Sequence, residues 1–194
     1  MTKNSILNLI NKTTFILSVA AFTLLLSCKS ETKSETEAKT LPQYETIREM
    51  LEDSGDFYEE NGSLKFISEE KSNIHIQVSK PISKNDLENA KEEIVKRDIV
   101  YVAFQTFAQT NLNELTITSL PLDFENKRKY YKKHQKTLKI DRTRAKSILK
   151  EYLNSNDFSI LFNLENGIWL PNKSFDKLKF QKLEEVYNKM RVNQ

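Results

Sequence analysis

The chain has 194 residues, a formal net charge of +3 at pH 7, and 38% hydrophobic residues. This length suits one domain that buries its own hydrophobic core without help from disulfides. A single cysteine and only three glycines exclude an internal disulfide, a cysteine-ligated metal site and a glycine-rich phosphate loop.

The first 27 residues have the pattern of a secretory signal peptide. Lys3 and Lys12 give a positive start, and an almost unbroken apolar run covers residues 15–26. The run is shorter than the roughly 20 apolar residues of a transmembrane span. It ends in Leu25-Leu26-Ser27-Cys28, which contains the only cysteine of the chain. This ending resembles the lipobox of bacterial lipoproteins, and the resemblance covers the leader alone.

The resemblance implies that the signal peptide is removed before Cys28 and that Cys28 becomes acylated. Two or more acyl chains give stable membrane attachment. The residue after the cysteine is Lys29 rather than Asp, which in such lipoproteins implies the outer membrane rather than the inner membrane. The resemblance therefore predicts a lipid-anchored protein of the bacterial cell envelope, with its periplasmic or surface orientation left open.

Residues 28–43 are predicted to be the acylated cysteine followed by a flexible tether, because small polar and charged side chains alternate there. Residues 44–194 are predicted to form a single domain. Its charge is uneven, with a net charge of −9 over 44–126 and +10 over 127–194. Acidic and basic surfaces that lie side by side in one fold are the favoured interpretation. The alternative is a dipolar domain with a basic face for an anionic partner.

The first half of the domain predicts two helices, a hairpin and two strands. A short helix follows Tyr44 and stops near Gly55, and Asn61-Gly62 predicts a hairpin turn between 57–58 and 64–67. The alternating residues 74–78 predict a strand, with His75 pointing away from the core. Ser83 and Asp86 resemble a capping box and predict the start of a long helix that runs to about Thr110. The second half of this helix is apolar on most sides and is expected to be deeply buried. A strand is predicted at 115–118.

The second half begins with residues 127–140, which predict an extended, very polar strand at the edge of the sheet. Asp141 is expected to cap a helix. Residues 158–164 predict a strand that turns at Asn166-Gly167 into 168–170, and 174–190 predicts a final helix.

These elements predict an α+β fold, an antiparallel sheet with helices packed on one face. The order from 74 to 164 is β-α-β-β-α-β, which matches a ferredoxin-like core. The hairpins and the C-terminal helix would be additions to that core. Because this order hosts many functions, it carries no functional conclusion.

The main candidate for binding is a basic strip with interleaved aromatic residues. Its members are Lys127, Arg128, Lys129, Lys132, Lys133, Lys136 and Lys139. An edge strand protected from aggregation by lysines explains it without a ligand. An acidic protein or an anionic lipid or glycan is the functional alternative, and the predicted location argues against nucleic acid.

Other chemistry receives little support from the sequence. His75 and His134 belong to no metal-binding motif, and no nucleophile motif is present, so no cofactor, metal or catalytic residue is assigned. The hairpin around Trp169 is either part of the core or an exposed interface or carbohydrate platform.

The leading functional hypothesis is a non-catalytic binding module of the cell envelope. The first alternative is a hydrolase acting on a cell-wall or surface polymer, which would need a concave pocket with two convergent acidic groups. The second alternative is an inhibitor or immunity-type lipoprotein that blocks one partner protein.

Overall fold

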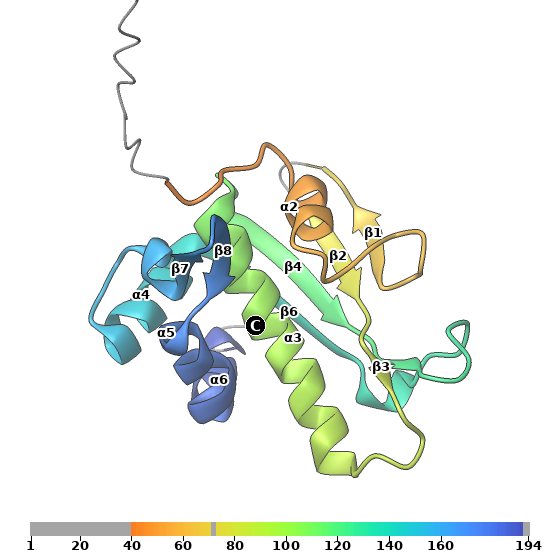
Figure 1. Cartoon of the computed structure of the whole chain (residues 1–194). Coiled ribbons are helices and arrows are strands. Elements are labelled where there is room, and N and C mark those ends of the chain that lie inside the picture. The colour runs from red at the N-terminus through yellow and green to blue at the C-terminus, as the bar shows by residue number, and fades with distance from the viewer. Residues whose placement is uncertain (1–39, 71–72, 192–194) are drawn as a thin grey trace, which may run out of the picture. The chain divides into compact units, whose positions relative to one another are not determined.

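The computed structural model describes residues 40–70 and 73–191 (Figure 1). The predicted signal peptide, Cys28 and the tether up to residue 39 lie outside the described residues. The packed chain begins before Tyr44, within the last part of the segment predicted as tether. Leu41 is buried, and the Gln43 side chain donates to the Ala108 carbonyl at 2.9 Å.

Helices and strands are mixed along the chain, which makes the fold α+β as predicted. The α-helices are α2 (Ile47–Asp53), α3 (Glu88–Gln109), α4 (Arg142–Leu153), α5 (Lys173–Asp176) and α6 (Leu183–Arg191). The strands are β1 (Leu64–Ser68), β2 (His75–Val78), β3 (Pro81–Ile82), β4 (Glu114–Ser119), β5 (Leu122–Asp123), β6 (Lys136–Asp141), β7 (Phe162–Glu165) and β8 (Ile168–Pro171). Short 3₁₀ turns η1 (Lys132–His134) and η2 (Phe158–Leu161) and a π-helical turn η3 (Lys177–Gln181) complete the elements.

The main sheet has the strand order β1-β2-β4-β6. The outer pairs β1/β2 and β4/β6 are antiparallel, but β2 and β4 are parallel neighbours. The prediction of an antiparallel sheet is therefore wrong at the centre, because α3 returns the chain beside β2 in the same direction.

The ferredoxin-like arrangement is also wrong. A split β-α-β unit has another strand between its two parallel strands, whereas β2 and β4 are adjacent here. In addition, β7 pairs with β8 in a separate hairpin and does not join the main sheet.

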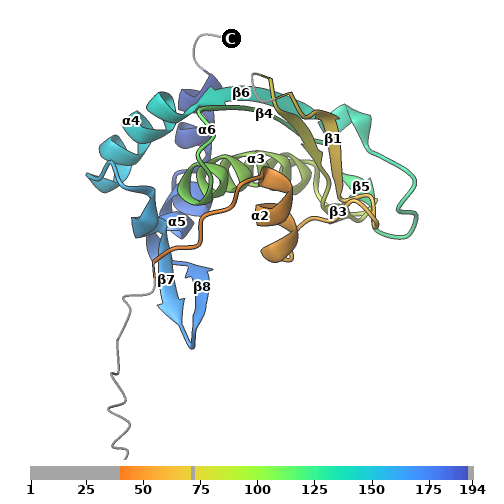
Figure 2. The ribbon, with the colours of Figure 1, turned by 90° about the horizontal axis from the view of Figure 1, so that it is seen from above.

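One face of the main sheet packs against helices, as Figure 2 shows for α3 and α2. Along the strands, buried residues such as Ile76, Ile117 and Leu138 alternate with polar ones. The opposite face carries Gln77, Thr116 and other polar side chains, which gives the half-buried alternation expected of such a sheet.

Helix α3 is the central core helix, as predicted, and its second half is almost entirely buried. Its N-terminus differs from the prediction. Asp86 accepts a hydrogen bond from the Ser83 N–H at 2.8 Å, which closes a turn ahead of the helix. The helix begins at Glu88 after Leu87, which provides no side-chain cap.

Two segments predicted as strands have other conformations. Phe57 is fully buried beside the turn at Gly62, and β1 pairs with β2 instead of with 57–58. The predicted edge strand over 127–140 is a strand only at β6. Asp123 accepts from the Glu125 and Asn126 N–H groups, at 2.9 and 3.0 Å, and turns the chain out of the extended path.

The C-terminal elements are mostly as predicted. Asp141 caps α4 by accepting from the Arg144 N–H at 2.8 Å, and β7 and β8 turn at Asn166-Gly167, both with positive φ. The segment 158–161 is a 3₁₀ turn rather than a strand, and the final helix is interrupted at η3.

Candidate functional site

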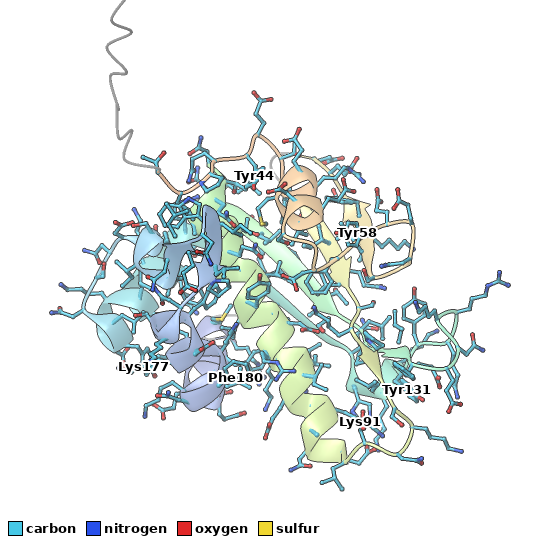
Figure 3. All side chains as sticks on the ribbon, viewed as in Figure 1. Tyr44, Tyr58, Lys91, Tyr131, Lys177 and Phe180 are labelled. Carbon is cyan, nitrogen blue, oxygen red and sulfur yellow. The ribbon has the colours of Figure 1, made fainter. Side chains whose placement is uncertain are left out.

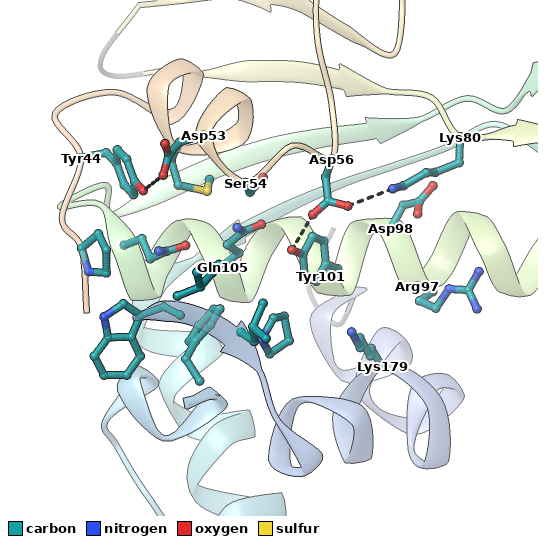
Figure 4. A pocket seen from close by; sticks show the side chains of 18 of the residues that line it. Tyr44, Asp53, Ser54, Asp56, Lys80, Arg97, Asp98, Tyr101, Gln105 and Lys179 are labelled. Atoms are coloured by element: carbon teal, nitrogen blue, oxygen red, sulfur yellow. Dashed lines mark hydrogen bonds and ion pairs between the residues drawn. The ribbon is translucent and has the colours of Figure 1, made fainter. Parts of the chain in front are cut away.

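A groove of about 840 Å³ runs along α3 (Figure 4). One side is formed by α2 and the loop after it, and the other by the β7–β8 hairpin and η3. The part of α3 that lines the groove extends from Ile94 to Gln109, or roughly 22 Å at the rise of an α-helix. The groove is therefore elongated.

The floor of the groove is polar. Apart from Ile94 at one end, its lining residues on α3 are polar, and their spacing places them on one helix face: Arg97, Asp98, Tyr101, Gln105 and Gln109. Polar groups on a buried helix face need partners, and their hydrogen bonds define the chemistry of the floor.

A hydrogen-bonded pair links the floor to the side of α2. The Tyr101 hydroxyl donates to Asp56 Oδ2 at 2.6 Å, and Lys80 Nζ lies 3.1 Å from Asp56 Oδ1 (Figure 4). Burial, followed by the charge of Asp56, raises the pKa of Tyr101 well above its usual range. Tyr101 therefore keeps its proton, and both oxygens of Asp56 have a partner.

Asp98 is the most deeply buried acid of the floor, with 5% of its surface exposed. The Ser119 hydroxyl donates to its Oδ2 at 3.3 Å. Burial raises the pKa of Asp98 to about 7, and the nearby charges of Lys80 and Arg97 only partly oppose this. Asp98 consequently titrates near neutral pH, where a carboxylic acid can donate or accept a proton.

The wall opposite α2 is apolar and partly open to solvent. Ile168 is 62% exposed, Leu170 43% and Phe180 51%. Trp169 is half-buried and packs against the core, which agrees with the core interpretation, and the interface or carbohydrate-platform interpretation of this hairpin stays a prediction. The Arg97 guanidinium lies 5.2 Å from the centre of the Phe180 ring at one end of the groove.

The basic strip is divided among a loop, η1 and β6, and most of it faces acidic side chains. The contacts are Lys129–Asp123 (3.6 Å), Lys133–Glu88 (2.7 Å), Lys136–Glu92 (2.5 Å) and Lys139–Glu114 (2.6 Å). Lys127, Arg128 and Lys132 are exposed and form no ion pair with any residue that the structure describes. The strip is therefore mainly an intramolecular charge interface.

Aromatic and histidine side chains of this region also face the domain itself. Figure 3 shows Lys91 on α3 near Tyr131, whose ring centre lies 5.9 Å from Lys91 Nζ. His134 is buried, with Nδ1 3.0 Å from Glu92. His75 lies on the polar sheet face and contacts Thr118 at 2.8 Å.

Within 40–70 and 73–191, no group of three or more His, Cys, Asp or Glu side chains is arranged to hold a metal ion. The helices of the same residues include none that is long and apolar enough to cross a bilayer.

Sequence reasoning did not identify the groove. The feature of the sequence that indicates a groove is the presence of the polar residues Asp98, Gln105 and Gln109 in the otherwise apolar second half of α3. Asp56 and Lys80 come from separate loops, and no local pattern predicts that Asp56 meets both Lys80 and Tyr101. Among the residues that line the groove, the sequence predicts a candidate surface only at the hairpin around Trp169.

Comparison with known protein families, with curated proteins and with solved structures finds no match for this chain.

Proposed function

We propose that this chain is a lipid-anchored protein of the bacterial cell envelope that binds an extended ligand in the groove along α3. The anchoring part rests on the lipobox-like ending at Cys28, and Lys29 after it favours the outer membrane. The binding part rests on one observation, a long groove with a polar floor and an exposed apolar wall.

The partners of the charged groups in the groove favour binding over chemical conversion. Asp56 is held by Lys80 and Tyr101, and Asp53 accepts a hydrogen bond from the Tyr44 hydroxyl. Side chains that are already held by neighbours give a preorganised surface, which lowers the entropy lost on binding.

Intrinsic fluorescence offers a direct test, because Trp169 is the only tryptophan and lines the groove. The described residues share one hydrophobic core, so the segment 39–194 would be used as the soluble protein. Envelope glycans, lipids and peptides would be titrated separately. We expect one class to change the Trp169 emission and to saturate.

Ile168→Asp should weaken that binding by at least about tenfold, because it places a charge on the exposed apolar wall. The matched control, Lys132→Asp in the basic strip, should leave the affinity unchanged. If Ile168→Asp has no effect while the control abolishes binding, the ligand is at the basic strip and the groove proposal is wrong.

A hydrolase is the second candidate, because Asp56 and Asp98 both line the groove. In that case Asp98, with its pKa near 7, would protonate the leaving oxygen while Asp56 activates water. The same titrations distinguish the two functions, since a hydrolase shortens the ligand and a binding protein returns it intact. The inhibitor or immunity-type function stays a prediction from the sequence.

A further inference from the structure

Two buried glutamines in the floor of the groove have unused acceptor atoms. Gln105 is 3% exposed and Gln109 6%, and the Oε1 atom of each has no hydrogen-bond partner among the residues that the structure describes. Buried acceptors of this kind are rare in folded proteins because they cost free energy. They therefore require an explanation.

Their placement points to a ligand. The two residues are one helical turn apart on the same face of α3, and both line the groove. Figure 4 shows Gln105 projecting from α3 into the groove beside Tyr101. Both Oε1 atoms are enclosed by the protein, so each amide must rotate about its last side-chain torsion to meet the hydrogen-bond donors that a ligand offers along the groove.

The opposite wall restricts the class of ligand. Ile168 and Leu170 are exposed there, and Trp169 contributes an aromatic ring. A lipid chain fits that wall but leaves the polar floor unsatisfied, at a cost in free energy. A sugar chain has apolar ring faces and a rim of hydroxyl groups, so it matches the wall and the floor together.

We infer that the groove binds a glycan chain, with Gln105 and Gln109 as acceptors for its hydroxyl or amide donors and Trp169 as a contact for its rings. This inference rests on the proposed binding function and adds the class of ligand. Two cations of the groove agree with it, since Lys80 faces Asp56 and Lys179 faces Asp176 within the chain. A neutral ligand leaves those pairs intact.

The test uses residues 39–194 and hexamers of N-acetylglucosamine, glucose and galactose as probes. Binding is followed by calorimetry and by Trp169 emission. We expect at least one hexamer to bind, and the double variant Gln105→Leu/Gln109→Leu to weaken it about 100-fold, about tenfold for each lost hydrogen bond.

The double variant should fold with an unchanged or higher Tm, because it removes two unsatisfied buried acceptors. If it fails to fold, the exposed-wall variant Ile168→Asp supplies the same test. The matched control is Gln135→Leu, which replaces an exposed glutamine outside the groove.

Two results would overturn the inference. One is the absence of binding by all three hexamers at millimolar concentration. The other is hexamer binding that the folded double variant leaves unchanged, or, if that variant does not fold, hexamer binding that Ile168→Asp leaves unchanged. If a pentapeptide or a phospholipid vesicle binds instead and Ile168→Asp weakens it, the groove remains the binding site and only the glycan class is wrong.

Discussion

The most consequential single residue in the groove is Asp98. Its carboxyl lies almost fully inside the fold, with one hydrogen bond from Ser119 and with Lys80 and Arg97 as the nearest opposing charges. A buried carboxylate without a direct ion pair is unstable as an anion. Its proton is therefore coupled to folding.

The sign of this coupling gives a prediction. Folding raises the pKa of Asp98 from 3.8 to about 7, so between these pH values the folded chain holds a proton that the unfolded chain has lost. The contribution of Asp98 to stability is present below pH 4 and is lost as the pH rises to 7. Asp98→Asn should remove this loss and raise the free energy of unfolding above pH 7 by up to about 4 kcal/mol, since each pKa unit corresponds to about 1.4 kcal/mol.

Urea unfolding at pH 5 and pH 8 measures the effect. The gain in the free energy of unfolding that Asp98→Asn gives over the unmodified chain should be larger at pH 8 than at pH 5. Glu165→Gln, which removes one exposed negative charge at the hairpin, serves as the control and should show no such difference. If Asp98→Asn and the unmodified chain have equal free energies of unfolding at both pH values, the raised pKa of Asp98 is contradicted.

At the scale of elements, Arg142 connects the end of α3 to the start of α4. Its guanidinium donates to the carbonyls of Phe107 (2.7 Å), Thr110 (2.6 Å) and Leu112 (2.9 Å). A cation is also favourable at the negative C-terminal end of a helix. This contact fixes the end of the helix that forms the floor of the groove.

Arg142→Met should therefore lower the free energy of unfolding by about 2 kcal/mol, because it leaves part-buried carbonyls without a charged donor. Chemical denaturation measures the loss. Lys146→Met on the same helix replaces an exposed cation and should change stability by less than about 0.5 kcal/mol. A similar loss of stability in Arg142→Met and Lys146→Met would mean that the hydrogen bonds from Arg142 to the three carbonyls do not stabilise the fold.

The elements also show what local sequence can specify. The cap at Asp141 and the turn at Asn166-Gly167 depend on residues next to them in the chain, and both predictions are confirmed. The parallel pairing of β2 with β4 depends on how α3 packs, which no local pattern reports. The groove could not be predicted for the same reason, since Asp56, Lys80 and Tyr101 come from three separate segments.

Over the whole molecule, the acidic first half and the basic second half pair with each other. Glu88 and Glu92 of α3 face Lys133 and Lys136 of the second half. The favoured interpretation of the charge distribution, acidic and basic surfaces side by side, agrees with these contacts. Lys127, Arg128 and Lys132 form no ion pair within 40–70 and 73–191, so they are the members of the strip on which we test a docking role.

Two charge reversals should separate the structural and the binding role of the strip. Lys133→Glu/Lys136→Glu should lower Tm by a few degrees, because each new carboxylate faces Glu88 or Glu92. Lys127→Glu/Arg128→Glu/Lys132→Glu should leave Tm unchanged, since these side chains are exposed.

If the strip also contacts an anionic surface, only this triple variant will lose low-salt binding to phosphatidylglycerol vesicles at an unchanged Tm. Vesicle binding that persists in the triple variant would exclude the strip as a docking surface and leave the groove as the candidate binding site.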